Sequence, residues 1–238
     1  MGKEPLALFK SFLALLLVSG TLLAAHWQYQ RGIDRHHLNV KIEANISKGE
    51  VALRQALKSP EKYEWQPIFD SGEFEDSNIL LRNHYFEGRY GFEVLTLFTP
   101  RDGQPYWVDR GWVEAGATAM DKPDIPPTPR GQVTIRGRFR LNSSLPQGTI
   151  FATGSSSNSP LIKELNAQKQ ITNQLFYVDL ISGSTSELTP KVPAELPELS
   201  DGPHMAYAAQ WLFFGGLIIY GRYLMRKNDV SNGKTKRT

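Results

Sequence analysis

Two long apolar runs lie near the two ends of this 238-residue chain and dominate its hydrophobic pattern. Residues 11–27 and residues 205–221 each contain 17 positions without a formally charged side chain. A helix needs roughly 20 residues to cross a bilayer core, and neighbouring apolar residues extend both runs toward that length. We therefore expect one transmembrane helix at residues 11–28 and a second at residues 204–225.

Each run has an alternative interpretation. The first resembles a secretory signal peptide with a small-residue cleavage site at Val18-Ser19-Gly20, but its apolar character continues to Trp27, which favours a retained anchor. The second has the length of a buried core helix. It ends beside the basic residues that follow Gly221, and this favours a membrane span.

The charges near the runs predict an orientation. Eight basic residues flank the two runs, whereas the segment between them carries 19 basic and 22 acidic residues. By the positive-inside rule we expect a multi-pass protein of the bacterial cytoplasmic (inner) membrane with a periplasmic central domain. The expected segments are a cytoplasmic N-terminal tail at 1–10, transmembrane helices at 11–28 and 204–225, an extracytoplasmic mainly β domain at 29–203, and a basic cytoplasmic tail at 226–238.

The central segment begins with helical spacing and then changes character. From about Ile33 to Leu57 the apolar spacing predicts a continuation of the first span and a short helix, broken at Lys48-Gly49 and stopped by Pro60. After Tyr63, aromatic and β-branched runs predict at least five strands in a meander. These predicted strands are residues 78–86, 91–99, 105–113, 133–141 and 175–181.

The connections complete the predicted domain. Short turns at 87–89 and 101–103 favour antiparallel hairpins. We expect an α+β domain dominated by an antiparallel sheet or partial barrel, carried between two terminal transmembrane helices. The predicted connections are an extended segment at 121–129, a Gly/Ser-rich loop at 153–160, a short helix at 161–169 and an extended tether at 190–203.

Composition excludes several classes of function. The chain has no cysteine, so it lacks disulfides, thiolate metal sites and a Cys nucleophile. Its mean hydropathy of −0.36 excludes a many-spanning transporter. A net charge of +3 gives little support to nucleic-acid binding, and we expect no nucleic-acid partner.

The central segment offers little enzyme chemistry. It contains no GxSxG, HExxH, phosphate-binding glycine loop or EF-hand motif. The acidic group Glu73, Glu75 and Asp76 is typical of a solvated face, and adjacent His36 and His37 point in different directions and chelate poorly. We expect no catalytic residues and a non-enzymatic role. An unrecognised enzyme, the alternative, would require a polar cleft in the central domain.

Polar and aromatic residues gather at the predicted outer ends of the two spans. His204, Tyr207 and Trp211 recur at helical spacing, with Gln210 beside them. Trp27, Gln28 and Arg31 lie at the same predicted depth on the first span. Imidazole, aromatic rings and Arg suit a porphyrin, whose propionates Arg can pair with. An aromatic belt at the headgroup level, which needs no ligand, is the interpretation that these residues alone favour.

Four segments resemble the surfeit locus protein 1 family, the assembly factors of haem-copper cytochrome oxidases. They keep the family's order along the whole chain. In sequence they read WQYQR at 27–31, GFEVLT at 91–96, WVDRGWV at 107–113 and HMAYAAQW at 204–211.

The resemblance implies a haem chaperone of the respiratory chain. It implies binding of haem a, or of another haem, and its insertion into oxidase subunit I, with His204 as the haem-iron ligand. Trp27, Gln28, Arg31, Tyr207, Gln210 and Trp211 are the expected surrounding haem-binding residues. Oxidase subunit I, the haem a synthesis enzyme and membrane lipid are the expected partners. The alternative is a haem-free membrane scaffold that stabilises an oxidase assembly intermediate.

The Arg110-Gly111-Trp112 segment has two interpretations. In the favoured one it builds the domain: Trp112 packs in the core, Gly111 permits a bulge and Arg110 pairs with an acid. Direct contact with a ligand is the other.

Overall fold

The computed structural model describes residues 6–116, 123–141, 165–167, 169–171 and 175–235. The chain divides into two compact units. One unit joins residues 1–41 to residues 198–238, and the other comprises residues 42–197.

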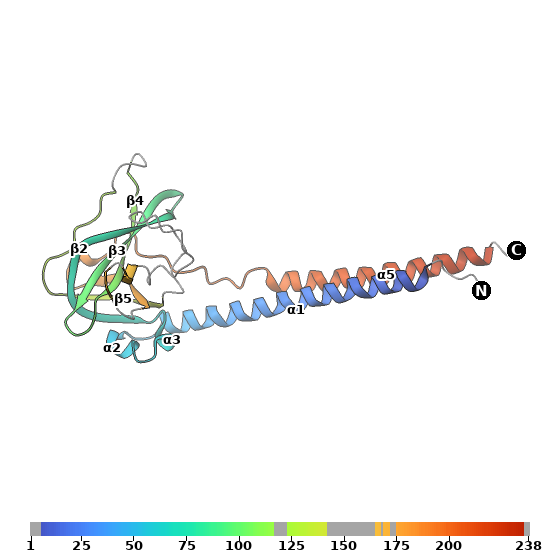
Figure 1. Cartoon of the computed structure of the whole chain (residues 1–238), viewed down its shortest axis with the longest axis horizontal. Coiled ribbons are helices and arrows are strands. Elements are labelled where there is room, and N and C mark those ends of the chain that lie inside the picture. The colour runs from blue at the N-terminus through green and yellow to red at the C-terminus, as the bar shows by residue number, and fades with distance from the viewer. Residues whose placement is uncertain (1–5, 117–122, 142–164, 168, 172–174, 236–238) are drawn as a thin grey trace. The chain divides into compact units, whose positions relative to one another are not determined.

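Residues 42–197 form a closed β-barrel (Figure 1). Its strands follow the order β2-β3-β4-β6-β5, and β5 pairs again with β2 to close the ring, while β1 adds to the side of β2. The strands are β1 (Val51–Ala52), β2 (Pro67–Phe86), β3 (Arg89–Pro100), β4 (Tyr106–Glu114), β5 (Val133–Leu141) and β6 (Phe176–Gly183). All five predicted strand segments are strands in the structure.

Two features of the predicted sheet were wrong. β6 lies between β4 and β5 and pairs with β4 in parallel, so the strands do not form a simple meander. The barrel is also closed, because β2 begins at Pro67 and is much longer than the predicted strand at 78–86. Residues 67–72 of β2 pair with β5, whereas residues 72–86 pair with β3. The polar composition of residues 70–77 conceals this first half of β2 in the sequence.

Gly72 marks the position where β2 passes from β5 to β3. A side chain there would overlap the backbone of β3 at Thr99 and Pro100. Glycine therefore permits the close approach that lets one long strand pair with two neighbours.

The helical segments follow the predicted break and include the predicted short helix, but Pro60 does not stop a helix. α1 (Ala7–Ile46) ends just before Lys48-Gly49, as expected. The short strand β1 then precedes α2 (Leu53–Ala56). Pro60 begins α3 (Pro60–Tyr63) and does not end a helix, because proline is tolerated in the first helical turn. A 3₁₀ helix, η2 (Ser186–Leu188), follows β6.

The structure describes only part of the predicted connections. Residues 123–129 have no regular secondary structure, as expected for an extended segment. Of the helix predicted at 161–169, residues 165–167 are helical. The predicted loop at 153–160 lies outside the described residues.

Apolar side chains pack on both faces of the barrel wall. The interior is filled by a cluster that includes Phe98, Tyr106, Val108, Phe139 and Phe176. A second cluster packs Trp107 and Tyr177 with Leu165 from the helical turn. The Trp107 indole N–H donates to Asn166 Oδ1 at 3.0 Å, so the turn is fixed to β4 by a buried hydrogen bond.

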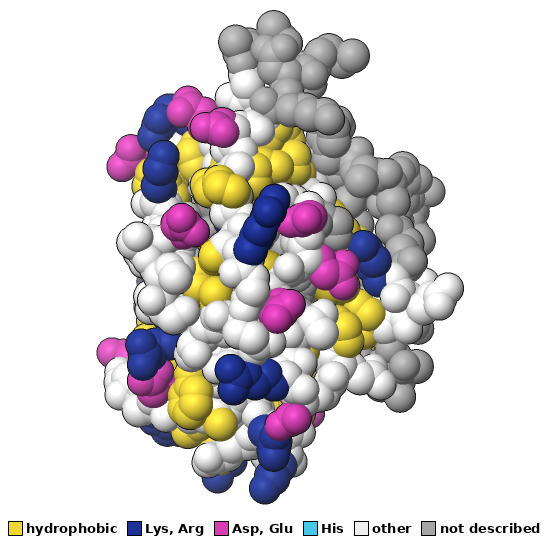
Figure 2. All heavy atoms as spheres, turned by 90° about the vertical axis from the view of Figure 1, so that its left-hand side faces the viewer, with side chains coloured by type: hydrophobic (Ala, Val, Ile, Leu, Met, Phe, Trp, Pro, Cys, Tyr) yellow, Lys and Arg dark blue, Asp and Glu magenta, His cyan; other side chains and the backbone are white. Residues whose placement is uncertain are grey.

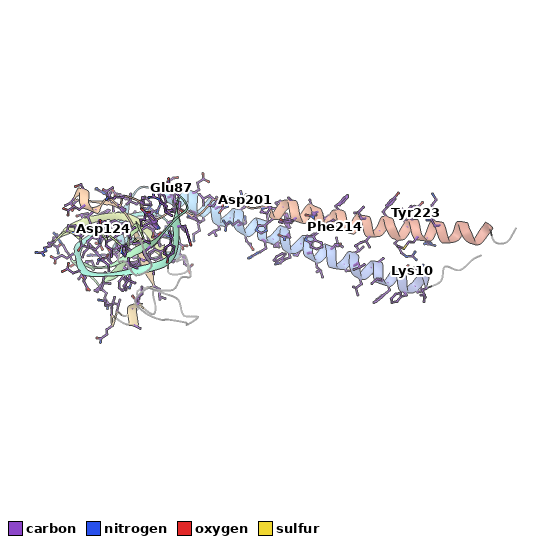
Figure 3. All side chains as sticks on the ribbon, turned by 90° about the horizontal axis from the view of Figure 1, so that it is seen from above. Lys10, Glu87, Asp124, Asp201, Phe214 and Tyr223 are labelled. Carbon is purple, nitrogen blue, oxygen red and sulfur yellow. The ribbon has the colours of Figure 1, made fainter. Side chains whose placement is uncertain are left out.

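The other unit pairs α1 with α5 (His204–Thr235), which run antiparallel and side by side (Figures 1 and 3). Among the described residues, α1 is the one helix long and apolar enough to cross a membrane. Gln210, three tyrosines and Arg222 lower the hydropathy of α5. The second membrane span therefore stays a prediction.

Candidate functional site

Small residues line the seam between α1 and α5. The least exposed positions recur at spacings of three and four on each helix, the pattern of antiparallel helices packed through one narrow stripe. They include Ala14, Val18, Thr21, Ala25, Gln28 and Gly32 on α1, and His204, Ala208, Gly215, Ile218 and Arg222 on α5.

Three contacts fix the register of this seam. Near one end, Met205 lies against Gly32, where an added Cβ would be 3.1 Å from Met205 Cε. In the middle, a Cβ at Gly215 would lie 2.8 Å from Thr21 Oγ1. Near the other end, Arg222 donates to Ser11 Oγ at 3.0 Å. Small residues thus permit close approach, and a polar contact joins the end at Arg222.

His204 lies in this seam at the first turn of α5. Its Nδ1 atom is 2.9 Å from Gln28 Oε1, and the pair is partly buried. An amide oxygen only accepts, so this contact assigns the Nδ1 proton to His204. The neutral ring then carries its lone pair on Nε2, for which the described residues supply no hydrogen-bond donor. Of the predicted site residues, the structure brings these two into direct contact.

The other predicted site residues lie on the outer surface of the helix pair. Trp27 is 58% exposed, Tyr207 47% and Trp211 37%. Arg31 and Gln210 are also exposed. The seam passes through Gln28 and His204, whereas these five residues lie on the parts of the two helix surfaces that the seam does not cover.

An aspartate that the sequence analysis did not single out anchors the start of α5. Asp201 accepts from His36 Nδ1 at 2.8 Å and from Asn39 Nδ2 at 2.9 Å. The hydrogen bond from His36 is the largest cause, and the one from Asn39 the next, of a pKa of Asp201 below its usual range. Asp201 lies where α5 begins beside α1 (Figure 3). No pattern in the sequence predicts that these polar residues meet at this turn.

Backbone contacts reinforce the same connection. The Arg35 side chain donates to the carbonyl oxygens of Ser200 at 3.1 Å and Glu198 at 3.0 Å. Gly202 adopts a left-handed conformation with φ of +67°, which glycine accepts without strain. The segment before His204 is therefore held to α1, and this fixes the position from which His204 donates to Gln28.

A buried ionic cluster lies on the barrel wall. Asp179 on β6 is 1% exposed and accepts from Arg140 Nη1 at 2.7 Å and Arg138 Nε at 3.3 Å. Arg138 also donates to the carbonyl of Ala194, and the Arg140 guanidinium lies 3.4 Å from the centre of the Trp65 ring. Both arginines therefore serve to balance one buried carboxylate and to join β5, β6 and the segment near Ala194.

Two further carboxyl groups, those of Asp109 and Glu93, lie beside this cluster. Burial is the largest cause, and the neighbouring Glu93 carboxylate the next, of a pKa of Asp109 well above its ordinary value. Burial likewise raises the pKa of Glu93, which accepts a hydrogen bond from Asp109. The Asp109 carboxyl also accepts from the Gly111 N–H at 2.8 Å. The raised pKa values favour a protonated Asp109 that shares its proton with Glu93 through this hydrogen bond.

This acidic pair lies outside the three clefts found among the described residues. Glu93, Asp109 and Asp179 line none of the three. Within the same residues, no three side chains of His, Cys, Asp or Glu are grouped as a metal ion would require. On the barrel face in Figure 2, basic and acidic side chains are interspersed among apolar ones. The acidic pair and its arginines are best explained as stabilising the barrel.

In the Arg110-Gly111-Trp112 segment, Trp112 and Gly111 build the domain as predicted, but Arg110 does not pair as predicted. Trp112 is 9% exposed, and Gly111, with φ of +88°, lies at a bulge where a side chain would overlap the backbone of Val192. Both predictions are confirmed. The predicted pairing of Arg110 with an acid was wrong among the described residues, because Arg110 donates to the carbonyls of Pro126 and Pro127.

The fold and the helix seam together define a closed β-barrel protein with an apolar helix that can anchor it in a membrane. Comparison with known proteins gives its family: the SURF1 family profile matches residues 15–216, and the chain belongs to the SURF1 family. An uncharacterised SURF1-like protein of Mycobacterium bovis is 28% identical over 227 residues, covering 88% of this chain and 80% of the relative. Uncharacterised SURF1-like proteins from two strains of Mycobacterium tuberculosis match equally.

Proposed function

We propose that this chain is an assembly factor for a haem-copper cytochrome oxidase, and that it holds haem a as cargo for insertion into subunit I. Membership of the SURF1 family, whose members are known as oxidase assembly factors, supports the assembly role. The haem-binding role rests on the side-chain chemistry of the seam between α1 and α5.

The observation that carries the haem proposal is the hydrogen bond between His204 and Gln28. Histidines that bind a metal through one ring nitrogen commonly donate the other N–H to an oxygen acceptor, which fixes the tautomer and the orientation of the ring. Gln28 supplies that acceptor to Nδ1 and leaves Nε2 for iron. The residues present therefore fit haem binding: His204 would hold the iron through Nε2, and the haem would supply the iron centre.

The exposed residues around His204 have a role in the same proposal. Trp27, Tyr207 and Trp211 present large aromatic surfaces on the outside of the helix pair. Rings of this kind pack against a porphyrin, and Arg31 can pair with a propionate. Gln210 adds a neutral hydrogen-bonding group. The same exposed surface is available to membrane lipid, to subunit I and to the haem a synthesis enzyme.

We extend the proposal to the membrane topology. α5 is taken as a second span alongside α1, with both termini in the cytoplasm and the barrel in the periplasm of a bacterial inner membrane. The antiparallel pairing with α1, along a seam of small residues, supports a helix hairpin. The basic residues beyond both apolar runs support the orientation.

The assembly role is tested in cells that lack this chain. Membranes from such cells, complemented with the wild type, His204→Ala or His26→Ala, are compared for haem a per subunit I polypeptide. His26 is an exposed histidine on α1, so His26→Ala is the matched control. We expect haem a in subunit I to fall without the chain and with His204→Ala, and to recover with His26→Ala.

Two outcomes would count against this proposal. Unchanged haem a in subunit I without the chain would contradict the assembly role. Recovery by His204→Ala, together with co-purification of subunit I, would favour the haem-free scaffold instead.

A further inference from the structure

A cleft of about 650 Å³ lies at β3, β4 and β6 of the barrel, beneath two connecting segments. Val94, Trp112 and Leu180 line it from the strands. Residues around Pro126 and around Pro190 line it from the connections. The cleft is separate from the seam that holds His204, and it contains the one charged residue of the Arg110-Gly111-Trp112 segment.

Arg110 lies in this cleft without an acidic partner among the described residues. Its Nη2 atom donates to Pro126 O at 2.8 Å and Pro127 O at 2.9 Å. Its Nη1 atom is buried and has no hydrogen-bond acceptor in the described part of the chain. The guanidinium lies 5.8 Å from the centre of the Phe74 ring. A charged group is thus held by neutral carbonyls and an aromatic ring.

Such an arrangement is costly unless an anion completes it. Burial lowers the pKa of Arg110, which shows that water solvates its charge poorly there. A buried donor without an acceptor costs about 1–3 kcal/mol, and more when the group is charged. A carboxylate supplies a charged acceptor with the spacing that a guanidinium fork matches.

The other charges in the cleft select for a single negative charge. Glu114 lines the cleft and pairs with Arg89 at 3.0 Å, so this acid is already balanced. Asp124 and Glu187 also line the cleft, and Lys191 is a third cation there besides Arg89 and Arg110. Two further carboxylates repel a dianion such as phosphate more strongly than a monoanion. Apolar walls at Val94 and Leu180 favour a ligand whose anionic group is attached to an apolar body.

We propose that this cleft binds a monocarboxylate carried on an apolar group, with Arg110 as the residue that holds the carboxylate. The carboxylate spans both terminal nitrogens of the guanidinium: it replaces the carbonyls of Pro126 and Pro127 at Nη2 and gives Nη1 the acceptor that it lacks. Binding therefore moves that segment, which rims the cleft. The terminal carboxylate of a peptide and a fatty acid share this chemistry.

Calorimetric titration of the full chain in lipid nanodiscs tests the proposal. The probes are N-acetyl-leucine for a peptide end, hexanoate for a fatty acid, N-acetyl-leucinamide as the neutral counterpart and inorganic phosphate as the dianion. We expect saturable binding of at least one carboxylate probe and none of the amide. Tighter binding of N-acetyl-leucine would identify a peptide end, and tighter binding of hexanoate a fatty acid.

Variants assign the binding to Arg110. Arg110→Gln is expected to weaken binding about tenfold or more, the loss that follows from removing a charged hydrogen bond. Arg54→Gln is the matched control, because Arg54 is an exposed arginine of the same unit that pairs with Asp102 outside this cleft. Arg110→Lys keeps the charge but not the fork, and should also bind more weakly than wild type. This variant provides the test if Arg110→Gln does not fold.

The proposal is overturned by any of three results: equal binding of the amide, tighter binding of phosphate than of either carboxylate, or wild-type affinity in Arg110→Lys. Its failure leaves the haem proposal untouched, because haem binding depends on His204 and is read from absorbance.

Discussion

At the scale of single residues, Gln28 determines which nitrogen of His204 is available. The hydrogen bond from Nδ1 to the amide oxygen of Gln28 leaves Nε2 as the free acceptor of the ring. His204 and Gln28 come from opposite ends of the sequence, yet both helical patterns placed them at the same depth. The sequence could predict that the two residues lie at a similar depth. It could not predict their direct contact, which depends on how each helix is rotated about its axis.

Substitution of Gln28 separates orientation from packing. Gln28→Glu keeps an oxygen acceptor for Nδ1 and should retain haem, whereas Gln28→Leu keeps the volume and removes the acceptor. We expect Gln28→Leu to weaken haem binding about 10-fold to 100-fold, the range for partners that orient a metal-binding histidine. Titration with haem, followed by absorbance, measures both. Equal affinities for the two variants would mean that Gln28 contributes only packing.

The acidic pair of Asp109 and Glu93 makes the stability of the barrel depend on pH. An acid whose pKa is raised on folding adds stability that is fully present below its unfolded pKa, near 3.8 for Asp109, and is lost as the pH rises through its folded pKa. Glu93, Asp179, Arg138 and Arg140 are the charged groups around Asp109. Barrel stability should therefore decline as acidic conditions give way to neutral ones.

Asp109→Asn should remove much of this decline, because the amide N–H₂ replaces the shared proton as donor to Glu93. Relative to wild type, the variant should gain up to about 1.4 kcal/mol of unfolding free energy per pH unit across that interval. Urea unfolding between about pH 4 and about pH 8 measures it, with Asp102→Asn as an exposed control. Parallel curves for wild type and Asp109→Asn would show that Asp109 holds no shared proton.

At the scale of elements, the pairing of α1 with α5 depends on small residues at a few positions. Gly215 faces Thr21 across the seam, whereas a Cβ on the adjacent Gly216 would meet nothing within 4 Å. Because side chains one position apart on a helix differ by about 100° in direction, these two glycines distinguish the two sides of α5. The apolar periodicity alone does not, since both sides of α5 carry apolar residues.

A disulfide tests this register directly, because the chain has no native cysteine. A Cβ at position 215 would lie 3.8 Å from Thr21 Cβ, which is the usual separation across a disulfide. We expect Thr21→Cys with Gly215→Cys to form an intramolecular disulfide on mild oxidation in membranes. Thr21→Cys with Gly216→Cys should remain reduced. Mass spectrometry of the intact chain distinguishes them, and the reverse result would place a different face of α5 in the seam.

At the scale of the whole molecule, local signals predicted the strands but not their order. The hairpins from β2 to β3 and β3 to β4 follow from short turns, which the sequence displays at 87–89 and 101–103. Closure of the barrel follows from long-range pairs, β2 with β5 and β4 with β6, and no short-range pattern encodes these. For the same reason, the polar residues around Asp179 were not predicted as one cluster, since they come from separate strands.

The two units also differ in the role that their polar side chains suggest. In the barrel, the buried charges of Asp179, Arg138 and Arg140 are balanced and fix the strands. In the helix pair, His204 keeps one ring nitrogen available near exposed aromatic residues. A carrier of this kind would hold its cargo with the helix pair and present the barrel to other proteins.

The absorption spectrum of the purified full chain, co-expressed with haem a synthesis, tests the central claim most directly. We predict a Soret band in the wild type and in the control His26→Ala, and its loss in His204→Ala while the barrel stays folded. A colourless wild type that still retains oxidase subunits would favour the haem-free scaffold. A Soret band of full height in His204→Ala would contradict the assignment of His204 as the haem ligand.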